Sequence, residues 1–251
     1  MRTETTAIDI PTADGVADAI LITPVEGGPH PGVLVYMDAF GLRPRLEQMG
    51  GRLAGQGYAV LVPNVFYRSG RAPVVELGDL SVPETRSAAF EKLGPVMQAL
   101  TPDRAMRDAD AYLAFLGTDE RVSRGPVGTV GYCMGGALAL RTAAQAPDRV
   151  AAVASFHGGR LATDRLDSAH LLAGRITAEV YIGHADNDGS MPPEQQERLA
   201  QALSDAGVRH RTELYAGAAH GFTMADTAAY DEAATERHWD RLTDLFARTL
   251  R

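Results

Sequence analysis

Short apolar runs alternate along this chain with longer segments that repeat apolar residues at helical spacing. The clearest run, Gly32 to Met37, is continuously apolar, which is typical of a strand buried on both faces of a sheet. Six further runs are predicted to be strands: residues 17–23, 58–63, 127–131, 150–155, 178–183 and 209–215.

Helical patterns fill most of the intervals between these strands. The predicted helices cover residues 44–55, 134–146, 192–206 and 227–251, and a short helix is predicted over 166–173. Because strands and helices alternate, we expect an α/β fold with a mostly parallel, twisted sheet and helices on both faces. In such sheets, sites form at the carboxyl ends of the strands.

The stretch of residues 64–101 breaks this alternation. It is rich in glycine and proline and carries one predicted helix, over residues 83–99. Connections of this length are uncommon and are often functional. We therefore predict a single domain over residues 1–251, in which 64–101 is an excursion that covers the active site.

Composition and charge argue against several classes of protein. The 32 acidic and 24 basic residues give a net charge of −8, and an acidic surface does not favour nucleic acid. No apolar run approaches the roughly 18 residues of a membrane span, and the first residues lack the apolar core of a signal peptide. The single cysteine excludes an intrachain disulfide and suits a reducing compartment. We therefore expect a cytoplasmic protein.

The segment Gly131 to Gly136, with the sequence GYCMGG, joins a predicted strand to a predicted helix. Cys133 stands at the tip of this Gly-x-Cys-x-Gly turn, which is the place of the nucleophile in a strand–turn–helix elbow. The flanking glycines let the helix pack close to the strand, and the helix N-terminus favours the thiolate. Most free cysteines are buried and unreactive, but the position of Cys133 predicts a nucleophile.

A nucleophile of this kind needs a base and an acid that orients the base, and in this fold they follow it in the order acid, base. His220 follows the last predicted strand and is the candidate base. Asp186 and Asp188 both follow the strand 178–183. We favour Asp188, which stands four residues before Pro192 at the start of the next helix, and the other aspartate would then serve the loop or cap the helix.

An oxyanion hole requires two backbone donors. The N–H of Met134 is one candidate, because this residue directly follows the nucleophile. The second donor comes from the loop after the strand 32–37 in such folds, and Ala39 is the candidate there.

Three segments together resemble the dienelactone hydrolase family: the GYCMGG turn, the upstream Asp38 to Gly41 (DAFG) and the downstream Ala219 to Phe222 (AHGF). The resemblance covers nearly the whole chain, and its Gly-x-Cys-x-Gly-Gly motif is specific because most α/β-hydrolases carry serine there. It implies an α/β-hydrolase fold and a triad that matches Cys133, Asp188 and His220. It also implies the two oxyanion donors already chosen.

The chain departs from the family pattern around the nucleophile. The best-known members have a thiol-tuning glutamate where this chain has Asp38, and they hold the substrate carboxylate with two arginines. Here Arg86 is kept and Met224 replaces the second arginine. Phe90 replaces a tyrosine near Arg86, and His157 matches a tyrosine that faces the site. The resemblance implies that Asp38 tunes the thiol in place of that glutamate, and we expect Arg86, Phe90, His157 and Met224 to line a more apolar pocket. The alternatives are a solvated Arg86 and an Asp38 that only caps a turn.

These residues predict a hydrolase that cleaves a small lactone or activated ester through a thioester acyl-enzyme. No metal is expected, because His184, Asp186, Asp188 and His220 lack the tight spacing of a zinc site. No cofactor is expected either, since no Gly-x-Gly-x-x-Gly follows the first strand. No nucleic-acid or membrane partner is expected, and nothing specifies an oligomeric state. The alternatives are a thioesterase or cyclising acyl-transfer enzyme of this fold, and a non-catalytic binding protein on the same scaffold.

Overall fold

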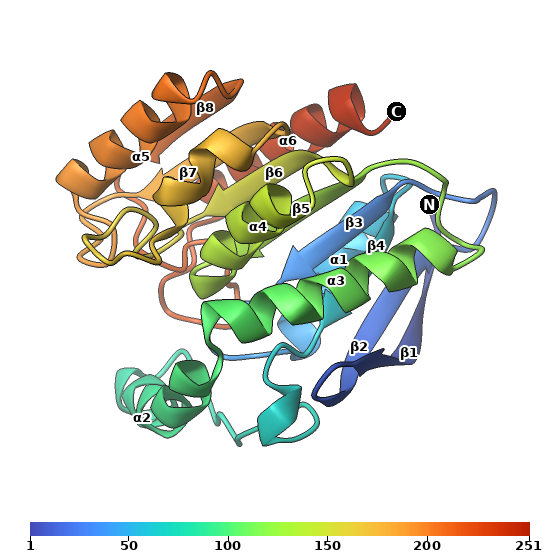
Figure 1. Cartoon of the computed structure of the whole chain (residues 1–251). Coiled ribbons are helices and arrows are strands. Elements are labelled where there is room, and N and C mark those ends of the chain that lie inside the picture. Colours follow the sequence, from blue (N-terminus) through green and yellow to red (C-terminus); the bar gives the residue numbers. More distant parts are fainter.

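The computed structural model describes all residues from 1 to 251 and contains one eight-stranded sheet. The strand order is β1-β2-β4-β3-β5-β6-β7-β8, and only β2 runs antiparallel to its neighbours (Figure 1). The strands are β1 (Thr3–Thr12), β2 (Gly15–Pro24), β3 (Gly32–Tyr36), β4 (Ala59–Pro63), β5 (Val127–Tyr132), β6 (Val150–Phe156), β7 (Glu179–Ala185) and β8 (His210–Tyr215).

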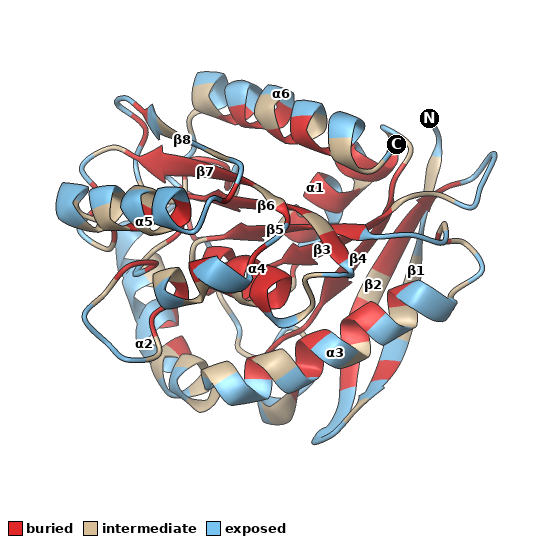
Figure 2. Ribbon diagram, turned by 45° about the horizontal axis from the view of Figure 1, so that its top comes forward, coloured by how far each residue is buried: buried red, intermediate tan, exposed pale blue.

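Helices cover both faces of this sheet. Figure 2 shows α1 and α6 on one face and α3, α4 and α5 on the other. The helices are α1 (Pro44–Ala54), α2 (Pro83–Ala99), α3 (Pro102–Thr118), α4 (Met134–Gln145), α5 (Pro193–Asp205) and α6 (Glu232–Thr249), with 3₁₀ turns η1 (Tyr67–Ser69) and η2 (Ala169–Arg175). Because β3, β4 and β5 lie between the two layers, every residue in them is buried. The predicted fold class is confirmed.

Two elements lie outside the set predicted from the sequence. The strand β1 has no apolar run because it pairs only with β2 at the edge of the sheet, and Ile10 is its one buried residue. The helix α3 follows the excursion directly, with Thr101 as its N-cap, and it buries Ala105, Tyr112 and Leu116 at helical spacing. That spacing is the signal by which α3 could have been predicted.

Two predicted helices begin several residues later than expected. The last helix starts at Glu232 rather than at residue 227, because the Asp231 carboxylate accepts the Ala234 N–H at 2.8 Å and caps it. The short helix predicted over 166–173 is the 3₁₀ turn η2 at residues 169–175. Leu166 contributes nothing to that turn, since its side chain is almost fully exposed.

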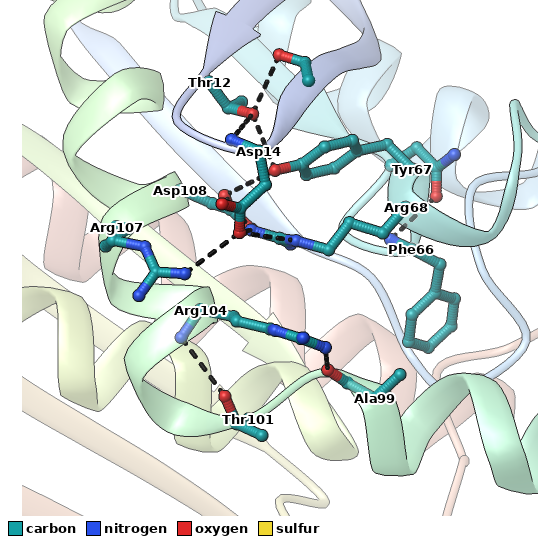
Figure 3. Close-up of polar contacts among 12 residues, drawn as sticks. Thr12, Asp14, Phe66, Tyr67, Arg68, Ala99, Thr101, Arg104, Arg107 and Asp108 are labelled. Carbon is teal, nitrogen blue, oxygen red and sulfur yellow. Dashed lines mark hydrogen bonds and ion pairs between the residues drawn. The ribbon is translucent and has the colours of Figure 1, made fainter.

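The excursion at residues 64–101 begins at a buried polar cluster, shown in Figure 3. Arg68 donates to both carboxylate oxygens of Asp108 on α3, at 2.7 and 2.8 Å, and to Asp14 in the β1–β2 turn. The Tyr67 hydroxyl donates to Asp108 at 2.9 Å. The rest of the excursion leads to α2, which lies beyond the carboxyl ends of the strands (Figure 1). This cluster fixes where the excursion leaves the core.

Candidate active site

Cys133 occupies a sharp turn between β5 and α4. Its backbone has φ 53° and ψ −119°, a left-handed conformation that is strained for any residue with a side chain. A Cβ atom on Gly131 would collide with the Gly135 carbonyl, and one on Gly135 would lie 2.6 Å from the Met37 oxygen. Glycine is therefore required on both sides of the turn, and its tip is raised at the carboxyl edge of the sheet.

His220 and Asp188 meet across two loops that follow neighbouring strands. The His220 Nδ1 and the Asp188 Oδ2 are 2.6 Å apart, and the side chain of Asp188 is 4% exposed. The cavity at this site has two arms, and His220 and Cys133 line both of them. The structure thus brings together the three residues that the sequence analysis selected as a triad, from the ends of β5, β7 and β8.

The charges in this group act on the imidazole. Burial opposes the charged ring, but the Asp188 carboxylate and the Cys133 sulfur outweigh burial and raise the pKa of His220 to about 10. Burial likewise acts to raise the pKa of Asp188, but hydrogen bonds from His220 and Ser190 outweigh burial and lower it. The electrostatics favour a protonated His220 beside an ionised Asp188.

Ser190 belongs to this group and was not selected from the sequence. Its Oγ and its backbone N–H donate to the Asp188 Oδ1 at 2.7 and 2.8 Å. Its Oγ also lies 3.3 Å from the His220 Nδ1. The Asp-x-Ser spacing is the signature of an Asx turn, and it could have indicated this residue.

Asp186, the competing acid, has different partners. Its Oδ2 accepts the N–H of Gly217 at 2.8 Å, and its Oδ1 accepts the N–H of Asn187 at 2.9 Å. Asp186 therefore ties the loop after β7 to the loop after β8. In that position it supports the loop that carries His220 without contacting the imidazole.

The two candidate oxyanion donors flank Cys133. Met134 is the first residue of α4, so its N–H has no carbonyl from a preceding helical turn. Ala39 lies in the loop after β3, and no acceptor within the protein takes its N–H. Both residues line the second arm of the cavity, together with Cys133 and His220. Their backbone amides are in the region where a carbonyl oxygen bound at the thiol would lie.

Asp38 is held by an arginine that the sequence analysis did not select. Arg43 donates to the two Asp38 carboxylate oxygens at 2.6 and 3.0 Å, and to Asp226 at 2.6 and 3.1 Å. Burial disfavours the guanidinium charge, but these two carboxylates outweigh burial and raise the pKa of Arg43 above its ordinary value. The Phe40 N–H adds a further bond to Asp38. Asp38 lines the cavity, but both of its oxygens are occupied by Arg43.

The first arm of the cavity has a volume of about 340 Å³ and contains all four candidate substrate-binding residues. Arg86 and Phe90 come from α2, and the Phe90 ring packs edge-on against Phe40 at 5.2 Å. Met224 is buried and presents an apolar thioether in the wall. Arg86 forms no salt bridge, so its guanidinium is available to a ligand.

His157 lines this arm as a buried side chain. Its Nε2 lies 2.8 Å from the Thr223 Oγ1, its Nδ1 has no partner, and its ring centre is 5.3 Å from that of His220. Burial, with a smaller effect from His220, lowers the pKa of His157 far below its ordinary value. The ring is therefore neutral. His184 is also neutral, since burial lowers its pKa to about 4.

The structure shows neither a metal-binding cluster nor a membrane-spanning helix. No group of three or more His, Cys, Asp and Glu side chains is placed to hold a metal ion. No helix is long and apolar enough to cross a lipid bilayer.

The family model described as "Dienelactone hydrolase family" matches residues 17–250. The chain belongs to this family. It is therefore a dienelactone hydrolase-like hydrolase with the α/β-hydrolase fold. This assignment confirms the resemblance drawn from the GYCMGG turn and its flanking motifs, and the roles of the individual residues stay a proposal.

Relatives of known name extend over most of the chain. A carboxymethylenebutenolidase of Rhodococcus opacus is 26% identical over 221 residues, which cover 87% of this chain and 81% of that protein. A protein of Synechocystis sp. is 28% identical over 251 residues, which cover 99% of this chain and 98% of that protein. It is provisionally named a carboxymethylenebutenolidase.

Solved structures of this family share the fold. A provisionally assigned dienelactone hydrolase from Klebsiella pneumoniae superposes with a TM-score of 0.85 at 23% identity, covering 99% of this chain and all of the other. A dienelactone hydrolase-like promiscuous phosphotriesterase from metagenomic libraries gives a TM-score of 0.82 at 24% identity, covering both chains completely. At these identities the likeness shows the fold alone.

Proposed function

We propose that this protein hydrolyses lactones or activated esters through a thioester formed on Cys133. The observation that supports this most directly is the placement of Cys133, His220 and Asp188 around one cavity, with a 2.6 Å contact between the last two. The names of its relatives support a lactone as the substrate class.

The reaction begins with attack of the Cys133 thiolate on the carbonyl carbon. The N–H groups of Met134 and Ala39 hold the developing oxyanion. When the carbonyl re-forms, the C–O bond to the leaving group breaks and the His220 imidazolium donates its proton to the leaving oxygen. Asp188 keeps the ring oriented and stabilises its charged form.

The second half of the reaction uses water. The neutral His220 takes a proton from a water molecule as its oxygen attacks the thioester carbonyl. Collapse of this intermediate expels the Cys133 thiolate and releases the carboxylic acid, which restores the thiolate–imidazolium pair. Because a thiolate is itself a good leaving group, substrates with poor leaving groups revert to ester, and enol lactones and aryl esters are favoured.

The surroundings of the thiol refine this proposal. Asp38 acts as the charged partner of Arg43, and this pair fixes the loop that carries Ala39. The excursion at residues 64–101 covers the site through α2, whose Arg86 and Phe90 line the first arm. With Met224 in the wall, this arm is suited to an uncharged substrate body.

Replacing Cys133 tests the proposal. The Cys133→Ala variant is expected to fold normally and to lose hydrolysis of p-nitrophenyl acetate and of dienelactone, because no second thiol exists. Mass spectrometry of the wild type mixed rapidly with p-nitrophenyl acetate is expected to find one acetyl group on Cys133. Activity of the variant within tenfold of wild type, or an unmodified Cys133, would contradict the mechanism and favour a binding protein.

A further inference from the structure

The second arm of the cavity leads away from Cys133 to a cationic recess that the proposed mechanism does not use. We call it the arginine recess; it has a volume of about 810 Å³. It lies between the end of α2, the loop after β6 and the start of α5, and Arg141 reaches it from α4. Arg160 and Ser190 line both the recess and the second arm, so the two spaces share a wall next to His220.

The charges in the recess are unbalanced. Arg141, Arg160 and Arg165 line it, whereas Asp167 is its only carboxylate. Asp167 pairs with Arg165 through two bonds of 2.8 and 3.0 Å. Two positive charges are therefore left without a carboxylate partner, in a chain whose net charge is −8.

The two unbalanced arginines differ in how firmly they are held. Arg141 is half-buried, and its guanidinium donates only to the backbone carbonyl of Asp167, so burial lowers its pKa below the ordinary value. The backbone of Arg160 has φ 55°, and its N–H donates to the Ser190 carbonyl at 2.7 Å. The Arg160 side chain has no acceptor at all. The backbone contact fixes Arg160 at the junction of arm and recess and leaves its guanidinium free.

An arrangement of this kind fits an anion. Guanidinium groups bind carboxylate and phosphate oxygens through paired N–H donors, and desolvation strengthens such bonds. The hydroxyl of Thr163 adds a neutral hydrogen-bonding group to the same wall, whereas the buried Ser168 hydroxyl is bonded within the protein. The first arm, by contrast, has a single free guanidinium, that of Arg86, and the buried Met224 contributes an apolar thioether to its wall.

From these observations we propose that the arginine recess binds the anionic end group, a carboxylate or a phosphate, of an extended substrate whose acyl carbon lies at Cys133. The proposal rests on the esterase function argued above. It places the charged end of the substrate beyond Arg160 and the reacting carbonyl at the elbow.

The test uses p-nitrophenyl esters of four-, six- and eight-carbon acyl chains. Each chain ends in a carboxylate, in a phosphate monoester or in a neutral methyl ester. We expect the wild type to give a higher kcat/KM for a charged ester than for the neutral ester at one chain length. The preference between carboxylate and phosphate identifies the end group. No preference for either charged ester at any length would overturn the proposal.

Arg160→Ala is the decisive variant, because this side chain forms no hydrogen bond or salt bridge within the protein and is not one of the three residues of the triad. We expect the charged-to-neutral ratio of kcat/KM to fall at least about fivefold. The ratio in the wild type should also fall as salt is raised, since a partly exposed contact is screened.

The matched control is Arg124→Ala. Arg124 is exposed, forms no salt bridge and precedes β5, at the opposite end of the parallel strands. The Arg124→Ala variant removes the same charge as Arg160→Ala, and we expect its charged-to-neutral ratio of kcat/KM to stay at the wild-type value. An equal loss in both variants, or no loss in Arg160→Ala, would show that the recess does not recognise the end group.

A binding measurement separates this proposal from the esterase mechanism. If p-nitrophenyl acetate is not hydrolysed, the proposed function fails, and the recess is then tested alone by calorimetric titration with inorganic phosphate. The wild type is expected to bind phosphate, and Arg160→Ala is expected to bind it at least about fivefold more weakly. Equal binding by both proteins, or no binding by the wild type, would overturn the proposal that the recess binds an anion.

Discussion

Asp186 and Asp188 differ by two positions, but their carboxylates serve different groups. Asp188 accepts from His220 at 2.6 Å and from Ser190, whereas Asp186 accepts backbone N–H groups of the neighbouring loops. A histidine acts as a base only in the correct tautomer and orientation, which the acid maintains. The two residues therefore form a matched pair for mutagenesis.

Asp188→Asn is expected to lower kcat for aryl esters by about 10³–10⁴-fold, because the amide no longer stabilises the His220 imidazolium. Asp186→Asn keeps one carbonyl acceptor for the loop and is expected to reduce kcat less than about tenfold. Stopped assays with p-nitrophenyl acetate measure both variants, and circular dichroism checks their folding. A stronger loss in the Asp186 variant would reverse the assignment of the acid.

The raised pKa of His220 links the site to stability. The folded protein binds this proton up to about pH 10, whereas an unperturbed histidine releases it near 6.5. The stabilisation is therefore complete below about pH 6.5 and is lost as the pH rises through 10. We expect the Tm of the wild type to fall more between pH 7 and 10 than the Tm of His220→Gln. Parallel Tm profiles would show that this proton does not contribute.

At the scale of elements, α2 is the least firmly packed helix around the site. Only Ala89 and Leu93 are buried in it, and it contains Pro95. It nevertheless provides Arg86 and Phe90 to the first arm of the cavity. Its position therefore depends on the two ends of the excursion, and the Arg68–Asp108 cluster holds the first of them (Figure 3).

Asp108→Ala is expected to lower the free energy of unfolding by about 3 kcal/mol, because it removes a buried carboxylate that pairs with Arg68 and Tyr67. The control Asp110→Ala changes an exposed residue of the same helix and is expected to stay within about 0.5 kcal/mol. Urea unfolding measures both variants. Equal unfolding free energies would show that the cluster does not anchor the excursion.

At the scale of the whole molecule, the sheet collects residues that are distant in the sequence. Arg43 contacts Asp226, 183 positions away, and also Asp38 beside the elbow. This ion-pair cluster joins the loop after β3 to the segment between β8 and α6. Both segments line the cavity, so their relative position is set by one buried guanidinium.

Arg43→Ala is expected to cost about 3–5 kcal/mol of unfolding free energy, because Asp38 is left charged and 5% exposed with no cation beside it. Arg71→Ala breaks an ion pair whose side chains are 65% and 55% exposed, and it is expected to cost less than about 1 kcal/mol. Denaturant titrations give both values. A small loss of unfolding free energy in Arg43→Ala would mean that water solvates the Asp38 carboxylate in place of the guanidinium.

The sequence by itself determined the alternating strands and helices, the fold class and the elbow at Cys133. These features are largely local: apolar periodicity specifies a buried strand or an amphipathic helix, and the Gly131 of the elbow is required by the Gly135 carbonyl four residues away. The strand β1 was beyond this reasoning, because an edge strand buries little and has no apolar run.

Apart from Asp188 and His220, only the tertiary structure decided which charged groups around the site are partners. Nothing near Arg43 in the sequence indicates Asp226, and nothing near Arg68 indicates Asp108. The free guanidinium of Arg160 beside the cavity is likewise visible only once the loops are placed. An ion pair depends on distances of a few ångströms between segments that the sheet brings together. Local spacing specifies the segments but not these distances, so the charges around the site had to be read from the fold.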